Sequence, residues 1–216
     1  MSTGAGDGAG DGDPKRLGIY GGTFDPVHWG HLLLAETARE ACELDEVWFV
    51  PSGSPPHKQG RPLTEPRHRI NMLELALTGL PWFSVSRIEI GADQPTYTAD
   101  TLKRLAAMHP QSELFFLMGA DSLADLPTWR QPDRIAELAT IVAVNRGDSD
   151  AAIPSECDSF ADRVTLTQMP ASGLSATDLR ERAATGRSLL FRTPRAVEIY
   201  IGEHRLYVSK AEAAQN

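Results

Sequence analysis

The sequence predicts an α/β protein: a Rossmann-like, doubly wound parallel sheet of about five to six strands in a single domain, with helices on both faces. Short runs rich in β-branched and aromatic residues alternate with amphipathic segments of helical length, a pattern typical of βαβ units. No internal repeat and no linker divides residues 15–208, and a chain of 216 residues suits one domain.

Six short segments are expected to form the strands: residues 17–20, 46–50, 83–90, 114–118, 140–144 and 164–168. Most of the segments between them carry apolar residues three or four positions apart, as an amphipathic helix requires. In the first such segment these include Leu34, Ala38 and Cys42. Later helices are expected to follow Pro66, Thr98 and Pro132. Ligands of a doubly wound sheet bind at the carboxyl ends of the strands, so functional residues are expected there.

Both ends of the chain are expected to lie outside the folded domain. Residues 1–14 hold five Gly and three Asp, a composition that cannot bury enough surface to offset the entropy of ordering. We therefore expect a disordered Gly/Asp-rich tail over 1–14, one folded domain over 15–208 and a frayed C-terminus over 209–216.

The composition argues against several classes of protein. Lys and Arg number 21 against 29 Asp and Glu, a net charge of −8 at pH 7, whereas nucleic-acid-binding surfaces show a basic excess. The longest apolar runs, such as 114–118 and 139–144, are far shorter than the roughly 20 residues of a membrane helix. Cys42 and Cys157 form no CxxC motif, so neither a disulfide framework nor a zinc site is expected. The N-terminus shows no signal-peptide pattern, and a cytoplasmic location is expected.

The segment after the first strand, GGTFDPVHWGH at residues 21–31, carries the clearest chemical signal. Gly21 and Gly22 allow the backbone to approach a ligand closely, and the N-terminus of the following helix favours anions. His28 and His31 are three residues apart, so both can face one ligand and donate hydrogen bonds to phosphate oxygens. In isolation, one of these histidines could instead cap the helix while the other packs against Trp29. Neither a Walker-type P-loop nor a GxGxxG motif is present.

This segment resembles the (T/S)xxHxGH signature of the nucleotidyltransferase α/β superfamily, and with GGTFDP it is similar to the bacterial nicotinate-nucleotide adenylyltransferases. Class I aminoacyl-tRNA synthetases share the HxGH element, but this chain is too short and too acidic for a tRNA enzyme. The resemblance implies an ATP site at the end of the first strand. Its members there would be Gly21, Gly22, Thr23, Phe24, His28 and His31.

Two further loops agree with the resemblance. VPSGSPPHK is similar to the family's PPHK/R loop, which implies that His57 and Lys58 contact substrate phosphates, although taken alone they would be solvated surface residues. PTYTADTL by itself predicts a helix start with Thr98 as N-cap. The resemblance adds that Tyr97 and Thr98 help to hold the carboxylate of nicotinate.

The ends of the fourth and fifth strands supply the other expected contacts to the mononucleotide. In GADSL…LPTW, the family pattern implies that Asp121, close to Gly119, accepts hydrogen bonds from ribose hydroxyls. It also implies that Trp129 stacks on the pyridine ring, although a lone Trp is more often a core residue. Arg146 follows the fifth strand and is implied to bind the 5′-phosphate.

The last motif, LSATDLR at residues 174–180, resembles the family's ISxTxxR signature. The resemblance implies that Ser175, Thr177, the helix N-terminus and Arg180 hold the β- and γ-phosphates of ATP. Independently, Ser175 followed three residues later by Asp178 predicts a helix cap. The Asp178 carboxyl group is expected to point away from the phosphates.

The implied reaction transfers AMP from ATP to nicotinate mononucleotide, giving nicotinate adenine dinucleotide and pyrophosphate. The attacking phosphate oxygen is already anionic, so the enzyme needs alignment and charge stabilisation rather than a general base or a covalent intermediate. His28, His31, Lys58 and Arg180 are the expected catalytic residues. Mg²⁺ is expected to be held by the triphosphate and water, with no metal site built by the protein alone.

Two other functions stay open from the sequence. One is a different nucleotidyltransferase of the superfamily, acting on nicotinamide mononucleotide, phosphopantetheine or a phospho-alcohol. The other is an inactive module that senses nucleotides; loss of a motif histidine or arginine would mark it, yet His28, His31 and Arg180 are present. The expected partners are the two small substrates, with no nucleic acid and no membrane, and the chain could also form a homo-oligomer.

Overall fold

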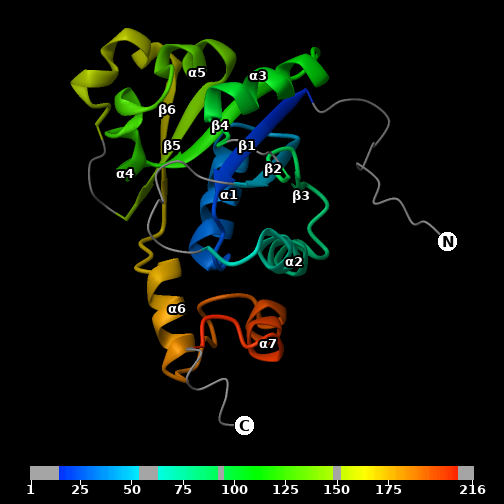
Figure 1. The fold of residues 1–216 in the computed structure, drawn as a ribbon. Helices are drawn as coiled ribbons and strands as arrows, with labels where there is room; N and C mark the ends of the chain where they lie inside the picture. The colour runs from blue at the N-terminus through cyan, green and yellow to red at the C-terminus, as the bar shows by residue number, and fades with distance from the viewer. Residues whose placement is uncertain (1–14, 54–62, 92–94, 148–151, 209–216) are drawn as a thin grey trace, which may run out of the picture.

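A six-stranded parallel sheet confirms the predicted fold class. The computed structural model describes residues 15–53, 63–91, 95–147 and 152–208 (Figure 1). The strands are β1 (Arg16–Gly22), β2 (Glu46–Pro51), β3 (Phe83–Val85), β4 (Glu113–Gly119), β5 (Thr140–Arg146) and β6 (Val164–Met169). Their order is β3-β2-β1-β4-β5-β6, and every neighbouring pair is parallel. Each strand lies where the sequence predicts one.

Helices cover both faces of this sheet. They are α1 (Trp29–Ala41), α2 (Pro66–Leu77), α3 (Thr98–Met108), α4 (Ala120–Leu123), α5 (Pro132–Leu138), α6 (Ala176–Ala184) and α7 (Arg195–Glu203), with 3₁₀ segments η2 (Leu126–Thr128) and η3 (Ser155–Arg163). Leu34 of α1, Leu73 of α2 and Val197 of α7 belong to one core, whereas Leu102 of α3 and Ile135 of α5 belong to a second. Among the helices that the structure describes, none is long and apolar enough to cross a membrane.

The strand residues divide between these two cores by position. On β4, Phe115 and Leu117 belong to the first core, while Leu114, Phe116 and Met118 belong to the second. Successive side chains of a strand point to opposite faces, so a strand with helices on both sides must be apolar throughout. This explains why β4 and β5 appear in the sequence as continuous apolar runs.

The strand order reverses between β1 and β4, and this reversal sets the position of the site. After β1 the chain crosses to one face of the sheet, and after β4 it crosses to the opposite face. A crevice therefore opens between the carboxyl ends of these two strands. In Figure 1, β6 runs down to α6, and α6 and α7 lie beyond this end of the sheet. The segments after β1, β4, β5 and β6 therefore gather along one edge.

The third strand is shorter than predicted, because β3 ends at Val85 rather than Ile90. Beyond it the chain turns, and the Ile90 N–H donates to the Arg87 carbonyl at 2.9 Å. The turn places Glu89 inside the protein, where only 9% of its surface is exposed. Burial of this carboxyl group, which a continued strand could not provide, is the physical reason for the difference.

The predicted N-cap of α3 was also wrong by one residue. Tyr97 caps the helix with an extended backbone (φ −112°, ψ 145°), and Thr98 is its first helical residue. The hydroxyl groups of Thr96 and Thr101 both donate to Glu89, at 2.8 and 2.7 Å. These two bonds hold the chain on either side of the helix start, so capping by the Thr98 side chain is not required.

Candidate active site

The turn between β1 and α1 is a tightly packed loop at the carboxyl end of β1. Phe24 is 1% exposed and has a left-handed backbone with φ 48°, a conformation that costs free energy for a side chain of this size. Its ring lies over Gly22, where an added Cβ would come within 2.9 Å of the Phe24 Cζ atom. A glycine is therefore required at position 22.

His28 and His31 form a stacked pair at the start of α1. Their ring centroids are 3.7 Å apart with an interplanar angle of 25°. The backbone N–H of His28 donates to Nδ1 of His31 at 3.2 Å. Because Nδ1 accepts this bond, a neutral His31 carries its proton on Nε2, which becomes the atom that can donate to a ligand.

His28 differs from His31 in its surroundings. It is 3% exposed, and burial, followed by the positive charge of Arg146, lowers its pKa from 6.5 to about 4. His28 is therefore a neutral imidazole at pH 7, and any hydrogen bond that it donates to phosphate comes from a neutral ring.

This shift predicts a pH dependence of stability. Between pH 6.5 and about 4 the unfolded chain binds a proton at this position and the folded protein does not, so the folded state loses stability as the pH falls through this window. Between pH 7 and pH 5 the loss through His28 should be about 2 kcal/mol. Urea unfolding of the wild type and of His28→Asn at both pH values measures it, since the other histidines contribute equally to both proteins. An equal loss in the two proteins would contradict the assignment.

Arg146 and Gly119 lie at the same edge of the sheet as His28. Arg146 ends β5, and its charge acts on His28. Gly119 ends β4, where an added Cβ would lie 3.9 Å from a terminal guanidinium nitrogen of Arg146. His28, Gly119 and Arg146 were predicted from three different motifs, and the fold brings them close to one another.

Arg130, the residue after Trp129, connects the segment of Trp129 to that of Tyr97. The Arg130 guanidinium lies 4.5 Å from the centroid of the Tyr97 ring and 3.8 Å from the Asp100 carboxyl group. Trp129 is half-buried and packs edge-to-face against Phe116 of β4, with centroids 6.1 Å apart. The Trp129 ring is therefore held by the protein on one side, as expected for a core residue, and is still partly open.

Asp121 and Thr98, two of the predicted mononucleotide contacts, lie at the starts of helices. Asp121 is exposed in the first turn of the short helix α4. Thr98 is half-buried at the start of α3. His57 and Lys58 lie outside the described residues, so their predicted roles stay predictions.

The motif at the start of α6 adopts the predicted cap. Ser175 Oγ accepts a hydrogen bond from the Asp178 N–H at 3.2 Å. The Asp178 carboxyl group lies 3.7 Å from the guanidinium of Arg192, in the C-terminal segment. Arg180 donates to Thr177 Oγ1 at 2.9 Å and to the backbone carbonyl of Asp25 at 2.7 Å. The arginine of the last motif is thereby tied to the loop of the first.

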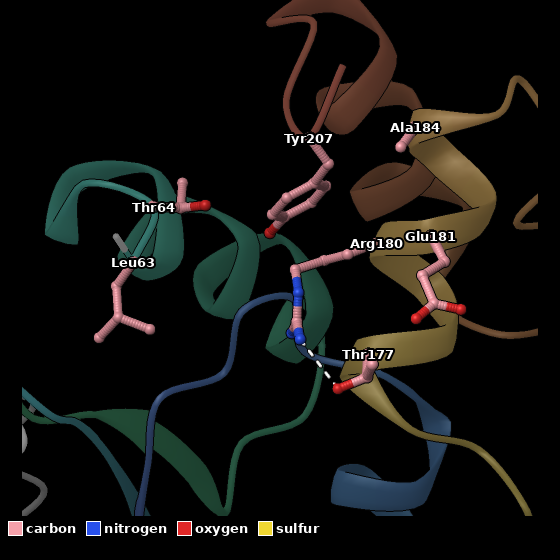
Figure 2. Close-up of a pocket in the computed structure, with 7 residues that line it drawn as sticks. All are labelled: Leu63, Thr64, Thr177, Arg180, Glu181, Ala184 and Tyr207. Atoms are coloured by element: carbon pink, nitrogen blue, oxygen red, sulfur yellow. Dashed lines mark hydrogen bonds between the residues drawn. The ribbon is translucent and has the colours of Figure 1, made fainter. Parts of the chain in front are cut away.

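A pocket of about 520 Å³ opens beside this arginine (Figure 2). It is lined by Leu63, Thr64, Thr177, Arg180, Glu181, Ala184 and Tyr207. One wall comes from α6 and the opposite wall from the segment that leads into α2. Arg180 and Thr177 therefore border space that a ligand could enter.

Comparison with known proteins identifies the family. The family model described as cytidylyltransferase-like matches residues 19–182. A curated relative from Thermomicrobium roseum, "Probable nicotinate-nucleotide adenylyltransferase", is 48% identical over 196 residues, covering 89% of this chain and 92% of the relative. The chain belongs to the nicotinate-nucleotide adenylyltransferase family. A relative of the same name from Thermus thermophilus is 43% identical, covering 89% of this chain and 99% of its own.

A solved structure of an adenylyltransferase shares the fold. Plasmodium falciparum nicotinic acid mononucleotide adenylyltransferase, complexed with NaAD, superposes with a TM-score of 0.74 at 21% identity. The match covers 89% of this chain and 97% of the other. The doubly wound sheet of this chain is therefore the fold of a known adenylyltransferase.

Three buried polar residues of this chain were missed from the sequence: Asp25, Arg69 and Glu89, all at most 9% exposed. Arg69 donates to three backbone carbonyls, those of Thr23, Ser52 and Thr64, at 2.8–2.9 Å. It thus joins the loops after β1 and β2 to the start of α2. Asp25 belongs to the GGTFDP motif and could have been singled out there, whereas Arg69 sits in a charged helical turn that carries no such signal.

Proposed function

We propose that this chain transfers AMP from ATP to nicotinate mononucleotide, forming nicotinate adenine dinucleotide and pyrophosphate in NAD biosynthesis. The observation that carries the proposal is the stacked His28–His31 pair at the carboxyl end of β1, with one arginine approaching from β5 and another from α6. A reaction between two phosphate groups needs donors and cations around one point, and this edge of the sheet supplies them.

Each predicted residue has a place in this reaction. His28 and His31 would donate to the α-phosphate, where negative charge builds in the transition state. Arg180 would hold the leaving pyrophosphate with Ser175, Thr177 and Lys58. Gly21, Gly22, Thr23 and Phe24 would shape the backbone around ATP, as the first motif implies.

The acceptor would lie on the other side of the histidine pair. Arg146, close to His28, would bind the 5′-phosphate and so bring its oxygen toward the α-phosphate. Asp121, next to Gly119, would bind the ribose. Tyr97, Thr98 and Trp129 would hold the nicotinate group, and His57 would contact the substrate phosphates.

Mg²⁺ is proposed to reach this site on ATP. Along the proposed phosphate path, His28, His31, Arg146 and Arg180 donate hydrogen bonds or carry positive charge, and Ser175 and Thr177 offer hydroxyl groups. Mg²⁺ prefers oxygen ligands and keeps several waters, so this donor set suits a metal held by the triphosphate. Bound there, the ion would offset charge on the phosphates. A cytoplasmic location belongs to the same proposal.

A substrate panel tests the proposed function. The purified protein is incubated with ATP, Mg²⁺ and one acceptor, and pyrophosphate and dinucleotide are both quantified. We expect equal amounts of the two products with nicotinate mononucleotide and a lower kcat/KM with nicotinamide mononucleotide. Preference for phosphopantetheine or nicotinamide mononucleotide would assign another transferase activity, and ATP binding without any product would favour a nucleotide sensor.

Trp129→Ala should raise the KM for nicotinate mononucleotide by about 2- to 10-fold, the range expected for loss of one aromatic stacking contact. The KM for ATP should stay within about twofold, because the proposed platform touches the pyridine ring alone. Trp82→Ala is the matched control, since Trp82 is 40% exposed and packs under Arg39. Steady-state kinetics in both substrates measures the effect, and equal changes in the two KM values would argue against a pyridine platform.

A further inference from the structure

The C-terminal segment, residues 187–208, is bonded to the loop after β1. Thr193 Oγ1 donates to the Val27 carbonyl at 2.8 Å, and the Trp29 N–H donates to the Arg192 carbonyl at 3.1 Å. The Tyr207 hydroxyl donates to Asp25 at 2.7 Å. These contacts come from residues beyond 19–182, the part that the family model matches. The loop that leads to the histidine pair is thus held by a segment with no assigned role.

Asp25 connects this segment to the site. It is 1% exposed, and one carboxyl oxygen accepts from Tyr207 while the other accepts from the Thr64 N–H at 3.3 Å. Its backbone carbonyl accepts from Arg180 at 2.7 Å. A displacement of Asp25 would therefore move the acceptor that orients the Arg180 guanidinium.

The groups around Asp25 favour a Tyr207 hydroxyl that donates to its carboxyl group. Arg69 is buried below the loop, with its guanidinium bonded to the carbonyls of Thr23, Ser52 and Thr64. Burial, followed by the neighbouring Asp25, raises the pKa of Tyr207 above its ordinary value, so its hydroxyl keeps its proton and donates. Removing that donor would take one hydrogen bond from a buried carboxyl group, which is costly.

We propose that Tyr207 is a positioning residue of the ATP site, whose hydroxyl acts through Asp25 to hold the Arg180 guanidinium toward the leaving phosphates. The inference rests on the proposed role of Arg180 in phosphate binding. Figure 2 shows the Tyr207 hydroxyl pointing toward the Arg180 side chain on the wall of the pocket. Through this link the C-terminal segment, residues 187–208, is part of the proposed site.

Tyr207→Phe tests this role, because it keeps the ring and removes only the hydroxyl. We expect kcat/KM for ATP to fall about tenfold and the Kd of Mg·ATP, measured by calorimetry, to rise, as for the loss of one buried hydrogen bond to a charged group. The KM for the mononucleotide should change less than about twofold, since Arg180 does not bind it. Tyr200→Phe is the matched control: its hydroxyl bonds Asn71 and His68, which fasten the C-terminal segment to α2 away from Asp25.

A double-mutant cycle separates positioning from simple stabilisation. In an Arg180→Lys background, Tyr207→Phe should change kcat/KM by less than about twofold, because the group that it orients is already gone. Asp25→Asn, which weakens the same link, should repeat the Tyr207→Phe effect on ATP. Additive losses in the cycle, or equal effects of Tyr207→Phe and Tyr200→Phe on ATP, would overturn the proposal.

The same measurements separate this proposal from the proposed function. A wild-type protein that binds Mg·ATP without forming dinucleotide would refute the function alone, and the Kd values of the two tyrosine variants would still decide the positioning role. A wild-type protein that does not bind Mg·ATP would overturn both.

Discussion

Replacing His31 by alanine should lower kcat by about 10²–10³-fold with little change in the KM for ATP, as expected for a donor that acts on charge developing in the transition state. The structure gives the chemical reason. Nδ1 of His31 accepts the His28 backbone N–H at 3.2 Å, so the donor proposed for the α-phosphate is Nε2–H. Steady-state kinetics at saturating ATP and nicotinate mononucleotide measures the loss.

Two conservative variants separate donation to phosphate through Nε2 from acceptance of the His28 N–H, which caps the start of α1, through Nδ1. In His31→Asn the amide can reach the position of Nδ1, so the variant can keep the bond to His28, whereas in His31→Gln the amide nitrogen can reach the position of Nε2. If donation to phosphate is the role, His31→Gln should retain more activity than His31→Asn. The opposite order would reduce His31 to a helix cap, and an unchanged kcat in His31→Ala would remove it from the mechanism.

Arg180→Gln should lower kcat/KM for ATP by about 10²-fold, the loss expected when one charged donor to a phosphate is removed. The variant can still bond Thr177 or the Asp25 carbonyl, so the link between α6 and the β1 loop is partly kept. What it lacks is the positive charge. Pyrophosphate release over a range of ATP concentrations measures the effect.

Arg187→Gln is the control for Arg180→Gln. Arg187 is an exposed arginine that follows the same helix, and its guanidinium bonds the Thr185 hydroxyl. It should leave kcat/KM unchanged within about twofold, because a lone surface arginine contributes little. If both variants lose activity equally, bulk charge rather than a specific phosphate contact would explain the result.

The positions of the central strands β1, β4 and β5 could be predicted because they are buried on both faces. Such strands need apolar residues at every position, so runs such as 114–118 stand out in an otherwise polar sequence. The motifs could be placed for a related reason, since parallel strands bring their carboxyl ends to one edge and the segments after them must meet there. His28, Gly119 and Arg146 are close to one another as a result.

The polar network under the site could not be predicted, because its partners are backbone carbonyls and distant side chains. Arg69 bonds three carbonyls in three loops, and nothing in its own helical turn distinguishes it from a solvated arginine. Glu89 lies in what looks like a strand until Thr96 and Thr101 are seen to bond it. The same holds for Tyr207, which bonds Asp25 across 182 residues of chain.

The acidic composition acquires a more specific meaning from this site. The chain carries a net charge of −8, yet both proposed substrates are anions. Arg146, at the end of β5, and Arg180, on α6, supply positive charge at the proposed site of an acidic protein. Net charge argues against nucleic acid as a partner, but it carries no information on phosphate chemistry in a cleft.

A single-turnover reaction with ATP labelled at the α-phosphorus tests the central claim most directly. Excess enzyme is mixed with labelled ATP, Mg²⁺ and nicotinate mononucleotide, or with the mononucleotide omitted, and the label is followed in ATP, AMP, dinucleotide and protein. We predict that the label passes from ATP to nicotinate adenine dinucleotide in one phase, matched by pyrophosphate, and stays in ATP when the acceptor is omitted. Label on the protein, label in AMP, or no transfer to the dinucleotide would contradict direct adenylyl transfer at this site.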